Sequence, residues 1–157
     1  MGYPFAVTRR LLPLLFLIPL STPAGEAGTE PYIPWTASDD YAIEEPLGGL
    51  VGDPARGREI ARDRGRGNCI ACHLLPIPEE PDHGTVGPPL IGVGSRLTEG
   101  QIRLRVVDEQ RVNPPTIMPA FYRDPARLTR VDPAYRGKTL LTAQEVEDLV
   151  AWLKGLK

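Results

Sequence analysis

Two thiols and an imidazole lie within five consecutive residues, Cys69-Ile70-Ala71-Cys72-His73. This spacing is the attachment pattern of a c-type haem. Each thiol adds to one vinyl group of the porphyrin, and the two-residue spacer lets both thiols reach the same ring. The histidine that follows supplies a nitrogen ligand beneath the iron. The motif therefore predicts one covalently attached haem c, with Cys69 and Cys72 as attachment residues and His73 as an axial iron ligand.

Two other uses of a Cys-x-x-Cys pair find no support elsewhere in the sequence. A redox-active dithiol of the thioredoxin type is expected within a βαβ pattern, which this sequence does not show. A zinc site needs a second pair of ligands, and the only other histidine is His83. His83 lies in a proline-rich loop with no neighbouring motif, so we expect a solvated side chain there rather than an iron ligand.

Met118 is the candidate ligand for the opposite side of the iron. The chain has two methionines, and Met1 would leave with the signal peptide described below. Met118 lies between prolines, in Thr116-Ile117-Met118-Pro119-Ala120-Phe121, where a stiff backbone can hold a side chain toward a metal. A thioether opposite an imidazole raises the haem potential and suits electron transfer. The alternatives are a methionine used for core packing, and an open iron position as in a sensor or ligand-binding haem protein.

Residues 1–27 have the pattern of a cleaved export signal. Arg9 and Arg10 precede an apolar stretch at 11–20, and small residues follow, with cleavage expected after Ala24 or Ala27. The stretch is too short to cross a bilayer as a helix, which needs roughly 20 residues. We therefore expect a periplasmic protein with no membrane anchor, a retained anchor being the alternative. The formal net charge of −2 and the lack of basic runs argue against nucleic acid as a partner.

The remaining chain is predicted to form a Pro-rich arm at 28–52 and one domain at 53–157. The arm has no helical or strand periodicity but carries Tyr32, Trp35 and Tyr41. It is either a poorly ordered terminus or a segment whose aromatic residues dock on a partner or on the domain's own surface.

Three helices are predicted in the domain, with no convincing strand pair, so the expected fold is all-α. The first spans residues 54–63, because Asp53-Pro54 reads as an N-cap followed by proline at the first helical position. The second spans 98–112, from the cap Thr98 to Asn113-Pro114-Pro115. The last begins at the capping box Thr142-Ala143-Gln144-Glu145, with Thr142 as the N-cap, and ends near residue 155.

The faces of these helices can also be predicted from spacing. The last helix carries an apolar stripe with core spacing, with Trp152 beside it. On the second helix, a group of charged side chains is expected to form a solvated face: Arg103, Arg105, Asp108 and Glu109.

The segment from Gly87 to Arg96, Gly-Pro-Pro-Leu-Ile-Gly-Val-Gly-Ser-Arg, is almost entirely apolar or glycine, yet has no helical periodicity. Such a segment suits backbone packed against a flat apolar ligand. The Pro88 carbonyl could accept the outer N–H of His73 and so fix its tautomer. The alternative is an ordinary turn-rich loop.

Together, the helix that leads into Cys-x-x-Cys-His, the Gly-Pro loop and the C-terminal Asp148-Leu149-Val150-Ala151-Trp152-Leu153-Lys154 resemble the class I cytochromes c. The resemblance implies three main helices and loops around one covalently bound haem. It also implies that the first and last helices cross, with Gly57 letting Trp152 approach. Arg96 matches a family arginine that pairs with a haem propionate, the alternative being a solvated surface arginine.

Within that class, the chain is similar to the SoxX family, the small cytochrome subunit of the SoxAX complex of thiosulfate oxidation. The similarity covers roughly 52–157 and rests on Gly67-Asn68-Cys69-Ile70-Ala71-Cys72-His73, Thr116-Ile117-Met118-Pro119-Ala120-Phe121-Tyr122-Arg123 and Pro133-Ala134-Tyr135-Arg136-Gly137-Lys138.

The SoxX resemblance implies an electron-transfer subunit of an L-cysteine S-thiosulfotransferase with a His/Met haem. Its implied partners are a SoxA-type cytochrome that carries the catalytic cysteine, the carrier protein SoxYZ and a downstream periplasmic cytochrome c. The alternative is a free-standing periplasmic electron-transfer cytochrome c.

Overall fold

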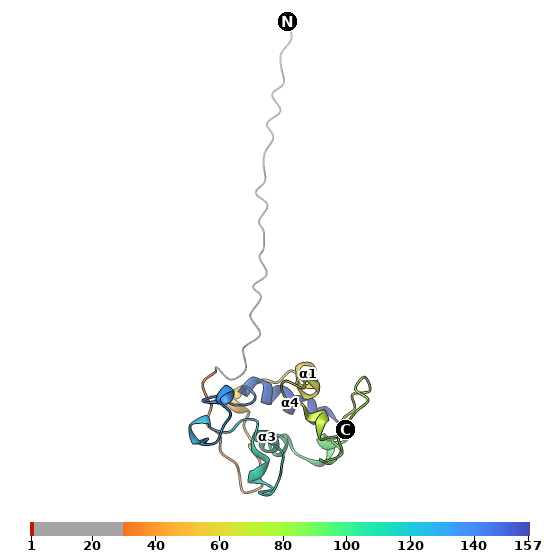
Figure 1. The fold of residues 1–157 in the computed structure, drawn as a ribbon. Coiled ribbons are helices and arrows are strands. Elements are labelled where there is room, and N and C mark those ends of the chain that lie inside the picture. Colours follow the sequence, from red (N-terminus) through yellow and green to blue (C-terminus); the bar gives the residue numbers. More distant parts are fainter. Residues whose placement is uncertain (2–29) are drawn as a thin grey trace.

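The computed structural model of the chain describes residues 1 and 30–157 (Figure 1). The predicted signal peptide therefore lies outside the described residues. Within them, four α-helices are joined by loops and short 3-10 turns, and no strand is present. The helices are α1 (Pro54–Arg62), α2 (Val93–Arg96), α3 (Glu99–Asp108) and α4 (Ala143–Gly155). The predicted all-α fold is confirmed, and α2 is a single turn in a segment for which the sequence predicted only a loop.

The three longer helices begin at the predicted caps. The Asp53 side chain accepts a hydrogen bond from the N–H of Ala55 at 2.8 Å, and Thr98 and Thr142 both form complete capping boxes. However, α3 ends at Asp108, before the expected residue 112, because Asp108 leaves the helical region with φ of −160°.

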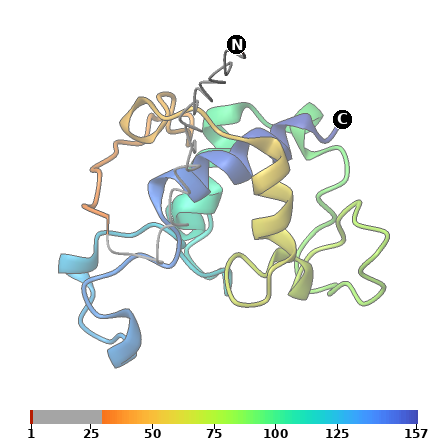
Figure 2. The same ribbon diagram turned by 90° about the horizontal axis from the view of Figure 1, so that it is seen from above.

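Helices α1 and α4 cross and form the most extensive helix pair of the described chain (Figure 2). Gly57 lies at the crossing. A Cβ atom added there would lie 1.9 Å from the carbonyl oxygen of Asp148. The glycine thus lets the backbone of α1 contact the backbone of α4 at Asp148 and Leu149, whereas the resemblance implied an approach of Trp152. Trp152, 8% exposed, belongs to the core.

Replacing Gly57 with alanine should therefore push α1 away from α4, although alanine is the better helix former. We expect the free energy of unfolding to fall by roughly 2–3 kcal/mol, toward the upper range for overpacked sites. Urea denaturation followed by circular dichroism measures the change. Gly155→Ala is the matched control, because an added Cβ meets nothing within 4 Å there; equal losses in the two variants would contradict the close contact.

The described part of the arm packs on the domain. Ala42, Ile43 and Leu47 are buried, and Ile43 and Leu47 belong to the same hydrophobic core as α3 and α4. Further toward the N-terminus, the Tyr32 ring stacks on Tyr122, with centroids 5.2 Å apart. Of the alternatives for the arm, the structure thus shows docking on the domain's own surface, through Tyr32 and Trp35 but not through Tyr41, which is 56% exposed.

The predicted solvated face of α3 is wrong for Arg103 and Asp108. Arg103 is 0% exposed and Asp108 5% exposed. The Arg103 guanidinium donates to both carboxylate oxygens of Glu147 on α4, at 2.9 and 3.0 Å, and to the carbonyl of Ile43 in the arm at 2.7 Å. A buried ion pair therefore joins the arm, α3 and α4.

Residues 123–139 form a loop that projects from the helical core (Figure 2). It contains two short 3-10 turns, Pro125–Arg127 and Pro133–Tyr135, each capped by a preceding aspartate. In the part of the chain that the structure describes, no helix has the length and apolar content needed to span a bilayer.

Candidate haem site

The Cys-x-x-Cys-His motif lies between α1 and a loop that runs back along it. Residues 69–71 form a 3-10 turn. The loop at 84–90 pairs with the motif region through three backbone hydrogen bonds. The N–H groups of Gly84, Gly87 and Leu90 donate to the carbonyls of Ile70 at 2.8 Å, Cys72 at 2.8 Å and Leu74 at 3.0 Å. This backbone pairing fixes the Gly-Pro loop beside the histidine of the motif.

The His73 ring is held by this loop. Its Nδ1 lies 2.7 Å from the carbonyl oxygen of Pro88. Because a carbonyl can only accept, Nδ1 carries the proton and Nε2 keeps its lone pair for a metal. A Cβ added at Gly87 would lie 2.3 Å from the imidazole, so the glycine makes room for the ring. The hydrogen bond is present, and the place of Pro88 in a haem pocket stays a prediction.

The two cysteines do not form a disulfide with each other. Burial raises the pKa of the Cys69 thiol to about 12. In a redox-active dithiol, by contrast, the attacking cysteine has a lowered pKa, which makes it a thiolate near neutral pH. The environment of Cys69 therefore does not suit the dithiol alternative. A zinc site gains no support either, because no three His, Cys, Asp or Glu side chains of the described residues cluster as metal ligands.

Met118 lies on the loop after α3. Its N–H donates to the hydroxyl of Thr116 at 3.1 Å, and its partly buried side chain packs against the same hydrophobic core as Cys69 and Leu90. The thioether, Cys69 and Leu90 of the Gly-Pro loop thus all pack on the single hydrophobic core of the domain. Ligation of iron by Met118 stays a prediction.

Arg96, at the end of α2, closes the Gly-Pro loop. Its exposed guanidinium donates to the carbonyl oxygens of Ile91 at 2.7 Å and Pro89 at 2.9 Å. It is thus tied to the loop rather than free in solvent. Since a guanidinium has five N–H donors, others remain for a carboxylate such as a haem propionate.

The prediction of a solvated His83 is wrong. Its Nδ1 accepts the N–H of Leu75 at 2.9 Å, and its Nε2 is buried without a hydrogen-bond partner among the described residues. His83 therefore closes the loop that leaves the haem motif. No sequence signal pointed to this contact, because it joins two loop positions.

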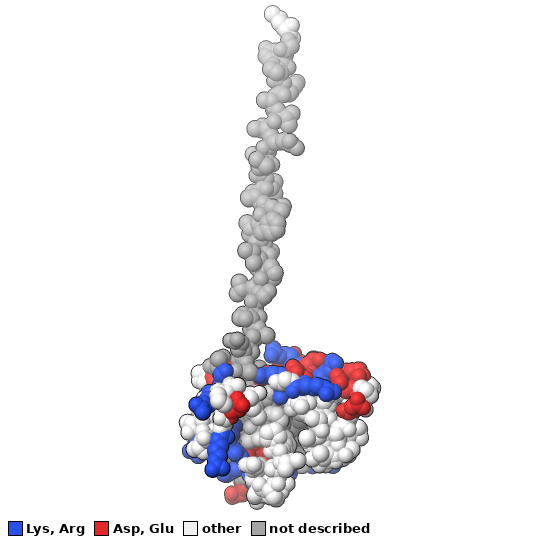
Figure 3. Space-filling model, viewed as in Figure 1, with Lys and Arg blue, Asp and Glu red and all other residues white. Residues whose placement is uncertain are grey.

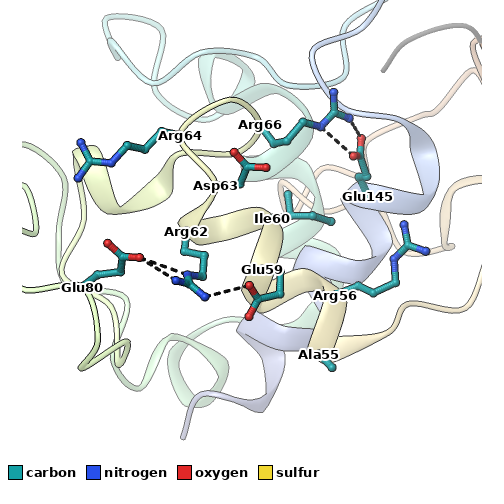
Figure 4. A pocket seen from close by; sticks show the side chains of 10 residues that line it. All are labelled: Ala55, Arg56, Glu59, Ile60, Arg62, Asp63, Arg64, Arg66, Glu80 and Glu145. Carbon is teal, nitrogen blue, oxygen red and sulfur yellow. Dashed lines mark hydrogen bonds and ion pairs between the residues drawn. The ribbon is translucent and has the colours of Figure 1, made fainter. Parts of the chain in front are cut away.

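A separate hollow of about 820 Å³ lies beside α1 (Figure 4). Arg62 pairs with Glu59 and Glu80, and Arg66 pairs with Glu145. Positive and negative side chains line the hollow in equal number: Arg56, Glu59, Arg62, Asp63, Arg64, Arg66, Glu80 and Glu145. Charged walls do not suit a largely apolar porphyrin.

The motif and its loop fit a covalent haem. They offer two cysteines at the attachment spacing that form no disulfide, an imidazole whose Nε2 is left for a metal, and a glycine where a side chain would displace the ring. Met118, on the same core, adds a soft donor of the kind that iron accepts opposite histidine.

Comparisons with known proteins place the chain among cytochromes. The cytochrome c family model matches residues 54–157. A chain in the crystal structure of SoxXA from P. pantotrophus has 36% sequence identity and a TM-score of 0.70, over 78% of this chain and 94% of that chain. No curated protein was found to match the sequence. The chain belongs to the cytochrome c family and, within it, to the SoxX cytochromes.

Proposed function

We propose that this protein is the electron-transfer subunit of a heterodimeric L-cysteine S-thiosulfotransferase, which oxidatively joins thiosulfate to a cysteine of a carrier protein. The observation that carries the proposal is the match to a chain of SoxXA at 36% identity over 94% of that chain. A SoxA-type cytochrome is the partner this match supports.

As a cytochrome c, the protein carries one covalently attached haem c, which supplies a one-electron redox couple when bound. Cys69 and Cys72 would tether it through thioether bonds, and His73 would bind the iron through Nε2 while Nδ1–H donates to Pro88. Met118 would supply a thioether ligand to the iron and favour the ferrous state. Arg96 would hold a propionate at the Gly-Pro loop.

The number of cysteines decides which subunit can provide the sulfur nucleophile. The chain has two cysteines, and both are committed to haem. It therefore has no thiol that could attack thiosulfate or hold a persulfide. The sulfur nucleophile would belong to the partner, and this subunit would contribute redox chemistry.

Electron counting limits how a single haem can take part in this reaction. Joining the outer sulfur of thiosulfate to a cysteine sulfur removes two electrons, whereas a single haem couple takes one. Either this subunit turns over twice for each conjugation, or a centre in the partner takes the second electron. The electrons would leave to a downstream periplasmic cytochrome c.

The surface near the candidate ligands suits a protein partner. Large apolar side chains are exposed next to the site residues in sequence: Leu74, Val86, Ile91 and Ile117. On the face shown in Figure 3, charged side chains gather along the edge that carries α1 and at the projecting loop. The area between them is largely uncharged and hollowed, and lies over the green and teal segments of Figure 1. A second subunit would bury these exposed apolar side chains.

The proposal is tested by purifying the tagged protein in the periplasmic fraction of its native host grown on thiosulfate. We expect a 1:1 complex with a second c-type cytochrome that is reduced by thiosulfate only when a SoxYZ-type carrier protein with an intact cysteine is added. The matched control is the carrier with that cysteine replaced by serine. A monomer that accepts electrons from other cytochromes without thiosulfate chemistry would instead indicate a free-standing shuttle.

A further inference from the structure

The loop that carries Met118 is fixed at its far end. Phe121 and Tyr122 follow Met118 by three and four residues, and their N–H groups donate to carbonyls in the last turn of α3, at 3.3 and 3.1 Å. The carbonyl of Phe121 accepts the N–H of Leu141 at 3.0 Å. Only two residues, at 119 and 120, separate the thioether from this anchored segment, so the position of the segment limits where the thioether can lie.

The N-terminal arm contacts this segment at Tyr122 through three of its residues. The indole N–H of Trp35 donates to the Tyr122 carbonyl at 3.3 Å. The N–H of Ile33 donates to the Tyr122 hydroxyl oxygen at 2.8 Å. The Tyr32 ring stacks on the Tyr122 ring, with an interplanar angle of 26°. Tyr122 is 2% exposed, so these contacts take place largely out of solvent.

We propose that residues 32–35 are a positioning strap for the iron ligand Met118, acting through Tyr122. The inference rests on the proposed His73/Met118 ligation. It assigns a function to the arm that the haem motif and the Met118 loop do not themselves imply.

The physical reason is the competition that a thioether meets at ferric iron. A neutral sulfur ligand on a loop is displaced whenever the loop opens, and the apparent affinity of a competing ligand rises with the open fraction. Contacts that exist only while the loop is closed lower that fraction. The hydrogen bonds from the arm to Tyr122 should exist only in the closed loop, because Tyr122 follows Met118 by four residues and would move with it.

The strap does not depend on titration near neutral pH. Burial raises the pKa of Tyr122 above its ordinary value, so its hydroxyl stays neutral and keeps accepting the Ile33 N–H. The hold should therefore be constant across the physiological pH range.

Two conservative variants of the haem-loaded protein test the strap. Trp35→Phe keeps an aromatic ring but removes the donor to the Tyr122 carbonyl, and Tyr122→Phe keeps the ring but removes the acceptor for Ile33. Titration of the ferric proteins with imidazole, followed by loss of the near-infrared thioether-to-iron band, measures displacement of Met118. We expect each variant to bind imidazole roughly three- to tenfold more tightly, tenfold being about 1.4 kcal/mol.

Leu47→Ala is the matched control. Leu47 is a buried arm residue whose N–H donates to Glu147 on α4 rather than to the segment that follows Met118. A cavity in the core weakens the whole fold, so this variant should lower the urea midpoint at least as much as the strap variants do. Because it keeps the contacts to Tyr122, its imidazole affinity should stay within about twofold of the wild-type value. An equal gain of imidazole affinity in Leu47→Ala would show a merely structural role and overturn the strap.

The remaining outcomes separate the strap from the proposed ligation. Unchanged imidazole affinity in both strap variants, beside a wild-type thioether band, would refute the strap alone. A wild-type protein without that band would refute Met118 as a ligand, and the strap with it.

Discussion

Replacing Met118 with alanine in the haem-loaded protein is expected to abolish the ferric near-infrared thioether band and to lower the midpoint potential by on the order of 100 mV or more, within the ~0.8 V range that axial ligands set. The soft thioether stabilises ferrous over ferric iron, and a water or hydroxide in its place reverses that preference. Absorption spectra and a potentiometric titration with mediators measure both effects.

Ile117→Ala is the control for this variant. Ile117 precedes the ligand but is 78% exposed, so its truncation should leave the band and the potential at wild-type values. Visible and far-ultraviolet circular dichroism would confirm that both variants hold haem and fold. A Met118→Ala protein with a wild-type potential would rule out this methionine as a ligand and favour an open or differently ligated iron.

The second large effect is expected at Arg103. In Arg103→Met, the Glu147 carboxylate stays buried without its cation, and the carbonyl of Ile43 loses its donor. Breaking a buried pair from one side typically costs about 3–5 kcal/mol. We expect a loss of that size in the free energy of unfolding, measured by urea denaturation of the haem-loaded protein.

Two further variants show whether the uncompensated charge is the cause. Arg105→Met removes the pair with Glu109 at 3.1 Å, in which the Arg105 side chain is 33% exposed. Its loss should cost no more than about 1 kcal/mol. Arg103→Met combined with Glu147→Leu removes both buried charges and should recover much of the loss. If Arg103→Met were no less stable than Arg105→Met, the buried pair would not hold the arm to the helices.

Much of the fold could be predicted because its signals are local. Asp53-Pro54 and Thr142 predict helix starts from only a few neighbouring residues, and α1 and α4 begin there. Arg103 shows the opposite case. Its spacing on α3 predicts a solvated charge, but its partner Glu147 lies 44 residues away. Nothing in the neighbourhood of Arg103 encodes that pairing.

The same distinction applies to the site. The attachment cysteines and His73 form one contiguous motif, and the Pro88 carbonyl lies within a short loop of it. By contrast, the contact of Trp35 with Tyr122 joins positions 87 residues apart. Periodicity could not distinguish an arm that packs on the domain from an unstructured terminus, because the arm has none.

The pairing of α1 with α4 sets the order in which this protein can mature. The N–H of Asp53, at the start of α1, bonds to Asp148, which is made 95 residues later. With 9 residues, α1 is shorter than the ~12–15 at which isolated helices become even marginally stable in water. If the chain is delivered from its N-terminus, we therefore expect both cysteines to stay accessible until α4 has been made and can pair with α1. The fold is completed only when α4, near the C-terminus, packs on α1.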